Sequence, residues 1–273
     1  MRKTIAIILV LFVMLFSLTG CSEENVEVKT SETTTTQTQT KTSAEKEERQ
    51  TVDDVDYAAA AKKQMAEPEV GEEVAIMHVK NFGDIKFKFF KDVAPKAVEN
   101  FLTHAKNGYY DGLTFHRVIN EFMIQGGDPD GNGTGGESIW GKGFPEELSL
   151  EIVPYRGTLC MASSGTGTSS LGSQFFITQA HYKADEGAYF SQVGLPEELR
   201  KQYEIYGGNI LSLYCSYTVF GQVYEGMDVV DKIAATKTEA VPLVIDGVTY
   251  GTQSDKPVND VVIESIEVTT YKK

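Results

Sequence analysis

Short runs of alternating apolar residues, separated by glycine-rich turns, fill the chain from Val70 onward and constrain its fold most strongly. The runs over 74–79 and 83–89 predict two strands with a turn between them. Further strands are predicted at 113–118, 122–125, 157–162, 175–178, 217–223 and 261–269. Two clear helical patterns stand among them, one from Pro95 to just before Gly108 and one over Met227–Ala234. Many short strands with few helices predict a mainly β fold, in the form of a closed barrel.

The N-terminal 20 residues have the pattern of a secretory signal peptide. Arg2 and Lys3 precede an apolar run that ends at Leu18, and the small residues that follow lead to Cys21. The run is too short for a transmembrane helix, which needs about 20 apolar residues. The ending Leu-Thr-Gly-Cys resembles a bacterial lipobox, which implies that Cys21 is lipidated and becomes the new N-terminus. We therefore expect a protein anchored to the cell membrane by lipid, on its extracytoplasmic face.

Residues 21–69 differ sharply from the rest of the chain. The stretch TSETTTTQTQTKTSAEKEERQ has no aromatic residue and little to bury, so the segment is predicted to be a disordered stalk. A short helix over 57–65 is the one element expected within it. The folded domain is predicted to cover 70–273. The formal net charge of −14 argues against nucleic-acid binding, which favours a basic surface.

Three nucleotide or metal motifs overlap in one glycine-rich loop, and each is incomplete. The dinucleotide spacing over 131–136 lacks the helix that should follow it, and the phosphate-loop spacing over 136–142 is followed by Gly143 instead of Ser or Thr. The calcium-loop pattern that starts at Asp128 has Ile139 where a bidentate Glu is needed. A tight surface loop explains all three, with calcium binding as a remaining alternative. No metal or cofactor is predicted.

Nucleophilic and thiol chemistry find little support. No Gly-x-Ser-x-Gly elbow is present in the sequence. Cys160 lies in an apolar run typical of a buried structural thiol, and a disulfide between Cys160 and Cys215 is left open. The histidines that lie outside the densest motif show no metal spacing, and structural or surface roles are expected for His78, His104 and His181.

The densest block of distinctive residues covers 115–129. Alternation along a strand places Arg117 and Ile119 on one face, and Met123 and Gln125 on one face of the next strand. Apolar side chains gathered with an arginine and a glutamine form an apolar pocket with few polar groups, which is the usual form of a ligand site. The alternative is an ordinary barrel strand with an exposed arginine.

The blocks FHRVI, FMIQGGDP, GNGTGGESI, GSQFFIT and YTVFGQV, in that order, resemble the cyclophilins, the peptidyl-prolyl cis-trans isomerases (EC 5.2.1.8). The resemblance extends from about Val70 to the C-terminus. It implies an eight-stranded antiparallel barrel capped by two helices, and it places the family's active arginine on Arg117. It assigns substrate binding to Phe122, Met123, Gln125, Gly133, Ala162, Ser163, Gln174, Phe176, Leu213 and Tyr217.

The chain departs from the family pattern between 179 and 212, a connection far longer than usual. A helix is predicted there, from near Pro196 to Gly207, at the rim of the presumed groove. It could serve as a lid, select clients or fill surface. Tyr217 stands where the family often has His, and Ser163 where Asn is usual.

Two functions follow from the resemblance. The first is an isomerase that acts on X–Pro bonds of exported proteins at the outer face of the membrane, with Arg117 assisting rotation of the amide. The second is a non-catalytic chaperone or assembly module that binds proline-containing peptides in the same groove. In both cases the partners are unfolded or exported polypeptides that contain proline, and the protein is expected to be a monomer.

Overall fold

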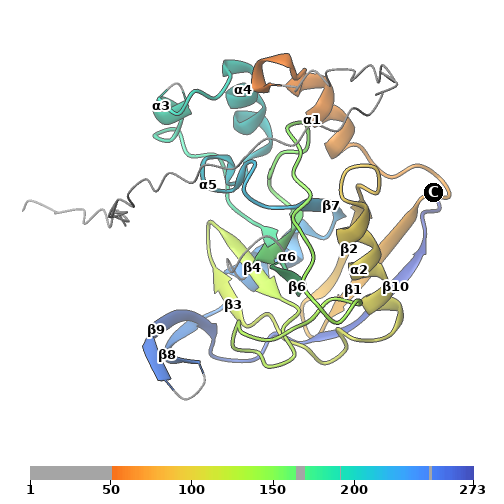
Figure 1. The fold of residues 1–273 in the computed structure, drawn as a ribbon, viewed down its shortest axis with the longest axis vertical. Coiled ribbons are helices and arrows are strands. Elements are labelled where there is room, and N and C mark those ends of the chain that lie inside the picture. Colours follow the sequence, from red (N-terminus) through yellow and green to blue (C-terminus); the bar gives the residue numbers. More distant parts are fainter. Residues whose placement is uncertain (1–50, 164–169, 191, 246–247) are drawn as a thin grey trace, which may run out of the picture. The chain divides into compact units, whose positions relative to one another are not determined.

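The computed structural model describes residues 51–163, 170–190, 192–245 and 248–273 (Figure 1). The predicted signal peptide, Cys21 and most of the predicted stalk lie outside these residues. The strands are β1 Glu73–Val79, β2 Gly83–Phe89, β3 Arg117–Ile119, β4 Met123–Gly126, β5 Thr158–Ser163, β6 Leu171–Thr178, β7 Val219–Glu225, β8 Thr238–Ile245, β9 Val248–Pro257 and β10 Ile263–Thr270. The helices are η1 Val52–Asp54, α1 Tyr57–Met65, α2 Pro95–Lys106, α3 Gly187–Phe190, α4 Glu197–Tyr206, α5 Ile210–Leu213 and α6 Met227–Ala234.

Eight strands form one curled antiparallel sheet in the order β10-β1-β2-β7-β5-β6-β4-β3. The prediction of a mainly β fold is confirmed, but that of a closed barrel is wrong. The edge strands β10 and β3 are not paired with each other, and an isolated bridge between Thr114 and Val262 joins the segments before them. Because β3 has only 3 residues and pairs with β4 alone, the sheet remains an open half-barrel.

Two helices cover the sheet and complete the main core. α2 begins with Pro95 in its first turn and buries Val98, Phe101 and Ala105 at helical spacing. It packs against β6, β7 and β10, whereas α6 packs against β2, β3 and β4. Phe101 lies at the centre of an aromatic group, with ring centroids 5.4 Å from both Phe175 and Phe220. The two helices that were expected to cap the sheet are therefore present.

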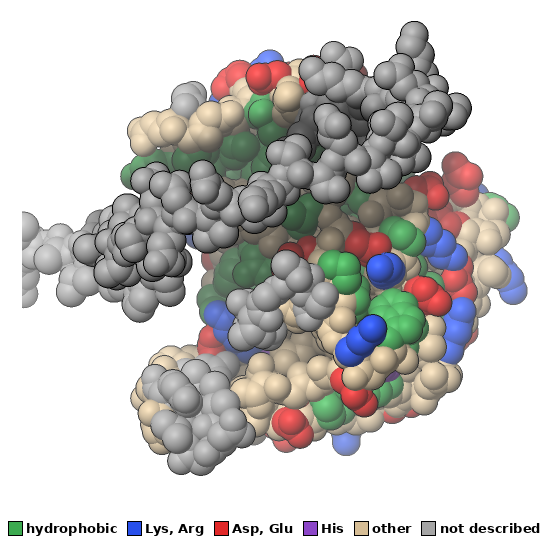
Figure 2. All heavy atoms as spheres, in the orientation of Figure 1, with side chains coloured by type: hydrophobic (Ala, Val, Ile, Leu, Met, Phe, Trp, Pro, Cys, Tyr) green, Lys and Arg blue, Asp and Glu red, His purple; other side chains and the backbone are tan. Residues whose placement is uncertain are grey.

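A second hydrophobic core lies outside the sheet, where α1 packs against the helical insert of α3, α4 and α5 (Figure 1). Its buried residues come from distant parts of the chain: Tyr57, Ala61, Val153, Tyr155, Phe190, Leu199, Tyr203 and Ile210. Hydrophobic side chains gather between the upper helices and the sheet below them in Figure 2. The insert predicted over 179–212 is thus helical and has its own packed interior.

The stalk prediction fails for residues 57–66, because α1 is bound to the folded domain by buried polar contacts. Gln64 donates to the carbonyl of Val153 at 2.7 Å and accepts from its amide at 3.0 Å. The buried side chain of Lys88, on β2, donates from its ammonium group to the carbonyls of Lys63 and Ala66 at the end of α1. The described residues, which start at Thr51, form one compact unit, so the domain begins well before Val70.

The strands β8 and β9 form a separate two-stranded hairpin that the sequence analysis missed. The hairpin follows α6 in the sequence and lies against β3 at one edge of the sheet (Figure 1). None of the helices within the described ranges is long and apolar enough to cross a membrane.

Candidate active site

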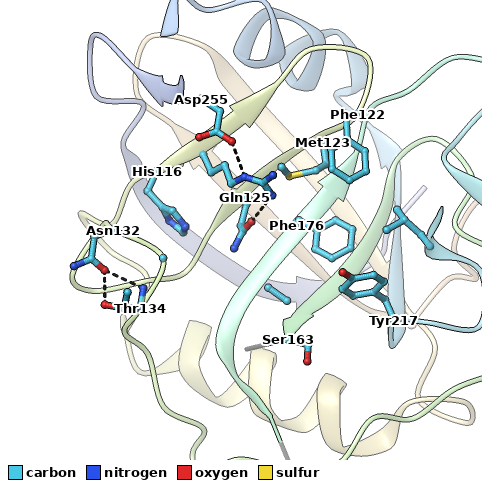
Figure 3. Close-up of a pocket in the computed structure, with 14 residues that line it drawn as sticks. His116, Phe122, Met123, Gln125, Asn132, Thr134, Ser163, Phe176, Tyr217 and Asp255 are labelled. Atoms are coloured by element: carbon cyan, nitrogen blue, oxygen red, sulfur yellow. Dashed lines mark hydrogen bonds and ion pairs between the residues drawn. The ribbon is translucent and has the colours of Figure 1, made fainter. Parts of the chain in front are cut away.

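A pocket of about 480 Å³ opens on the face of the sheet that β3, β4 and β6 share (Figure 3). Its volume falls within the range of small-ligand pockets. It is lined by His116, Arg117, Phe122, Met123, Gln125, Asn132, Gly133, Thr134, Ala162, Ser163, Phe176, Leu213, Tyr217 and Asp255. Of the site residues predicted from the sequence, all but Gln174 and Cys21 line this pocket.

Strand register brings the main site residues together. Arg117 on β3 lies opposite Gln125 on β4, and Ile119 lies opposite Met123. Gln125 in turn lies opposite Phe176 on β6. Directly paired residues point to the same face of a sheet. The two predicted sets, Arg117 with Ile119 and Met123 with Gln125, therefore lie on one surface. The predicted gathering of these side chains is confirmed.

One side of the pocket is an apolar cup. Met123, Phe176 and Leu213 are 1%, 4% and 3% exposed, and Phe122 and Tyr217 pack against the same cluster. The rings of Phe176 and Tyr217 meet edge to face, with centroids 5.3 Å apart. Such a cup suits a compact apolar ring and excludes most water. The aromatic ring of Tyr217 thus supplies a wall of the pocket.

The helix α5, which begins within the insert and ends just after it, carries Leu213 into this cup. Tyr214, the next residue, donates from its hydroxyl to the carbonyl of Leu150 at 2.8 Å and is hydrogen-bonded to the hydroxyl of Tyr57 on α1. These contacts join the end of the insert to the pocket wall, and the three roles considered for the insert stay predictions.

The opposite side of the pocket is polar and consists of linked hydrogen bonds. Nε of Arg117 donates to Oδ2 of Asp255 at 2.7 Å, and Nη1 donates to Oε1 of Gln125 at 3.3 Å (Figure 3). Nε2 of Gln125 donates to Oε1 of Gln174 at 2.9 Å, and Gln174 donates to the carbonyl of Gly135 at 2.8 Å. The guanidinium is therefore held in place on the rim of an apolar cup, and not free in solvent.

Gln174 lies in a neighbouring pocket of about 570 Å³ that continues the first one. The two share Gln125, Gly133, Thr134, Ala162 and Ser163, so together they form one groove. The prediction that Gly133 and Gln174 line a groove agrees with this geometry. Ala162 and Ser163, at the end of β5, lie where both pockets meet.

The glycine-rich loop owes its shape to Asp128, which is buried. Its carboxylate accepts hydrogen bonds from the amides of Asp130, Asn132 and Gly133, at 2.9, 3.1 and 2.6 Å. Gly133 has a φ of 87°, which favours glycine, and this conformation lets the loop approach the pocket. The acidic residue that suggested a calcium loop is thus used by the loop's own backbone. Within the described part of the chain, no group of three or more His, Cys, Asp or Glu side chains is arranged to hold a metal ion.

Four pocket residues were not identified from the sequence: His116, Asn132, Thr134 and Asp255. His116 is 3% exposed, and neither ring nitrogen has a hydrogen-bond partner among the described residues. Burial lowers the pKa of this ring, because desolvation disfavours the charged form, so the ring is neutral at pH 7. Its place between Phe115 and Arg117 in the motif gave a signal for His116; nothing in the sequence linked Asp255 to the site.

Neither thiol forms a disulfide, and Cys160 is buried whereas Cys215 is exposed. Burial raises the pKa of the Cys160 thiol to about 12, so it stays protonated and unreactive at neutral pH. The rings of the other histidines hydrogen-bond to neighbouring residues: His78 contacts Asp84, His181 contacts Glu121, and His104 contacts the carbonyl of Glu137. The expected structural roles for these residues are confirmed.

Comparison with known proteins agrees with this geometry. Residues 74–268 match the family model of the cyclophilin type peptidyl-prolyl cis-trans isomerases. A protein of Staphylococcus haemolyticus, provisionally named a peptidyl-prolyl cis-trans isomerase, is 51% identical over 195 residues, which cover 70% of this chain and 89% of that one. A Staphylococcus aureus protein with the same provisional name is 49% identical over 205 residues, covering 74% and 94% of the two chains.

A solved structure is also similar. The crystal structure of a Cryptosporidium parvum cyclophilin type peptidyl-prolyl cis-trans isomerase in the presence of the dipeptide Ala-Pro superposes with a TM-score of 0.55 at 30% identity, covering 72% of this chain and 99% of that one. The chain therefore belongs to the cyclophilin-type isomerases. It is an enzyme of the peptidyl-prolyl cis-trans isomerase class, EC 5.2.1.8.

Proposed function

We propose that this isomerase acts on X–Pro bonds of exported polypeptides at the outer face of the cytoplasmic membrane, with Arg117 assisting rotation about the amide. The observation that carries the proposal is the position of a fixed guanidinium at the rim of an apolar cup, on strands held in register. The similarity to a cyclophilin studied with Ala-Pro supports proline as the residue that enters the cup.

The reaction needs no nucleophile. Resonance in the amide opposes rotation by about 18–20 kcal/mol, and uncatalysed exchange takes tens of seconds. A rate of about 10–1000 per second needs roughly 3–7 kcal/mol of transition-state stabilisation. An apolar cup and one well-placed hydrogen-bond donor are enough for an effect of this size.

The side chains of the pocket divide this task between them. The cup of Phe122, Met123, Phe176 and Leu213 disfavours the planar amide, which is more polar than the twisted one. As the imide nitrogen leaves the amide plane it regains a lone pair, which a cationic donor stabilises selectively. Arg117 has five N–H bonds, of which Asp255 and Gln125 accept two, and Nη2 has no partner among the described residues. The Nη2 edge is therefore the part of Arg117 that donates to the substrate.

The test of this mechanism is the variant Arg117→Ala in a protease-coupled assay on proline peptides. We expect kcat/KM to fall about 100-fold with the fold intact, as when one preorganised donor is removed from an active site. Arg200→Ala, which removes an arginine on α4 outside the pocket, is the matched control and keeps normal turnover. Near-normal turnover of Arg117→Ala contradicts the mechanism.

The same variants separate the enzyme from a non-catalytic module that uses the groove only for binding. Phe176→Ala opens the floor of the cup and is expected to weaken peptide binding, whereas Arg117→Ala leaves the cup intact. If folding of client proteins is still assisted by Arg117→Ala but not by Phe176→Ala, binding and not turnover is the function in the cell.

The location rests on the sequence of residues 1–21, which lie outside the described residues. The basic start, the apolar run and the lipobox-like ending support export and lipidation at Cys21. A labelled fatty acid fed to bacterial cells is expected to enter the wild-type chain and Cys215→Ala, but not Cys21→Ala. Equal labelling of wild type and Cys21→Ala rules out an anchor at this residue.

A further inference from the structure

We propose that Asp255, carried by the hairpin β8–β9, is a positioning residue for Arg117. Its carboxylate fixes the plane of the guanidinium so that the Nη2 edge faces the proline site. This inference rests on the proposed role of Arg117 and names the group that orients it.

The contact between the two side chains is short and largely shielded from water. Nε of Arg117 lies 2.7 Å from Oδ2 of Asp255, and the two side chains are 34% and 17% exposed. A hydrogen bond between two charged groups at this distance is stronger than a neutral one. Shielding from solvent also makes it stronger than an ion pair on the open surface.

Two anchors on one rigid group define its orientation. The guanidinium is planar, with five N–H bonds in a fixed fork. Asp255 holds Nε, and Gln125 holds Nη1 from the neighbouring strand. Gln125 is itself held by Gln174, which is bound to the glycine-rich loop. If Asp255 is removed, one anchor remains, and the guanidinium can rotate about the bond to Gln125.

The base of the hairpin, near Asp255, is held firmly in place. Asp255 lies close to the end of β9, next to the point where Thr238 pairs with Pro257. Pro257 is buried, and β9 lies against β3, the strand that carries Arg117. The base of the hairpin is therefore fixed to the same edge of the sheet as the arginine it contacts.

A purely structural role fits the geometry poorly. Oδ1 of Asp255 is buried and has no hydrogen-bond partner among the described residues. A buried, unsatisfied carboxylate oxygen lowers stability, and shielded ion pairs in general contribute little net stability. Asp255 thus serves the orientation of Arg117 more than the attachment of the hairpin.

The experiment compares Asp255→Ala, Asp255→Asn and Glu239→Gln in the full chain. Glu239→Gln removes one negative charge from the exposed face of the same hairpin and is the matched control. We measure kcat and KM on a proline peptide, the melting temperature, and the exchange with solvent of the Nε–H proton of Arg117 by ¹⁵N NMR. The NMR signal reports the anchor directly, and a merely structural role would not move it.

For Asp255→Ala we expect kcat to fall about tenfold with little change in KM, because misplacement of a catalytic group by a fraction of an ångström has effects of this order or more. The Nε–H proton should exchange faster, and the melting temperature should stay near that of the wild type. Asp255→Asn keeps an oxygen that can accept from Nε, so it should recover part of the rate. Glu239→Gln should match the wild type in all three measurements.

The outcomes separate this inference from the mechanism on which it rests. If Arg117→Ala is inactive but both Asp255 variants turn over like Glu239→Gln, the positioning role is overturned and the role of Arg117 stands. The positioning role is also overturned if activity falls only in proportion to the melting temperature while the Nε–H signal is unchanged. If Arg117→Ala remains active, the role of Arg117 itself fails.

Discussion

Two parts of the molecule outside the eight-stranded sheet reach the same pocket by different chemistry. On one side α5, at the end of the helical insert that packs against α1, supplies Leu213 to the apolar cluster of the cup. On the other side the hairpin β8–β9 supplies Asp255, whose carboxylate forms the ion pair to Arg117. The first part completes the wall of the cup, and the second acts on the group that performs the chemistry.

The contrast shows that the way in which an added segment is attached decides whether it affects stability or reaction rate. A segment with its own buried core contributes to the stability of the whole domain, so removing any of it is felt globally. A segment joined to the site through one charged contact can change the reaction while stability changes little. Loss of stability should therefore follow changes on the helical side, and loss of rate should follow changes on the hairpin side.

The largest expected effect is that of removing α1 from the helical side. A chain that starts at Val70 loses the buried side chains of Tyr57 and Gln64 and leaves the amide of Val153 without the oxygen of Gln64 that it donates to. We expect a loss of roughly 3–5 kcal/mol in the free energy of unfolding, the range for removing a large buried side chain. This corresponds to a drop of about 10 °C in melting temperature for a domain of this size, measured by calorimetry.

The matched control for this truncation is a chain that starts at Thr51, which keeps η1 and α1. Its melting temperature should equal that of the full chain. Equal melting temperatures for the two truncated chains would mean that α1 adds no stability and would remove the contrast between the two sides.

A smaller loss of stability is expected when the pH is lowered, and it arises at His116 on the polar side of the pocket. Burial lowers the pKa of His116 below the ordinary value for histidine of about 6.5, with nearby Asp128 opposing this shift and Arg117 adding to it. Below pH 6.5 the unfolded chain therefore binds a proton at this residue that the folded chain does not, and stability falls as the pH falls. Burial lowers the pKa of His104 as well, which acts in the same direction.

Denaturant unfolding between pH 7 and pH 5 measures this dependence. In His116→Gln the loss of stability on acidification should be smaller than in the wild type, with the remainder due to His104. The exposed residue His181 provides the control, since His181→Gln should not reduce the loss. An unchanged pH dependence in His116→Gln contradicts the neutral, buried state of this ring.

The sequence predicted the sheet and most of the pocket because both depend on local patterns. Alternation placed Arg117 and Gln125 on one face, and the strand register then set them opposite each other. The predicted helix over 227–234 has the bounds of α6, since its apolar spacing is regular and Gly226 precedes it. The closed barrel was wrong because closure depends on whether two distant edge segments pair, which no local pattern records.

The parts that were missed depend on contacts between distant residues. The alternating runs around Asp246-Gly247, a dipeptide typical of two-residue hairpins, were a signal for β8 and β9 that could have been used. The pairing of Asp255 with Arg117, 138 residues away, left no such signal. The helix at 57–65 was expected, but its attachment was not, because its partners are the distant insert, the backbone of Val153 and the side chain of Lys88.

The fastening of α1 has a mechanical consequence. One end of this helix is held by Lys88 on the sheet, and Tyr57 at its other end touches Tyr214, the residue after Leu213. Tension applied at the N-terminal end of α1 is thus transmitted through the helix to Tyr214, which directly follows Leu213 at the end of α5. The N-terminal side of the described domain and the pocket wall near Leu213 are therefore braced by the same short helix, so a load on one is transmitted to the other.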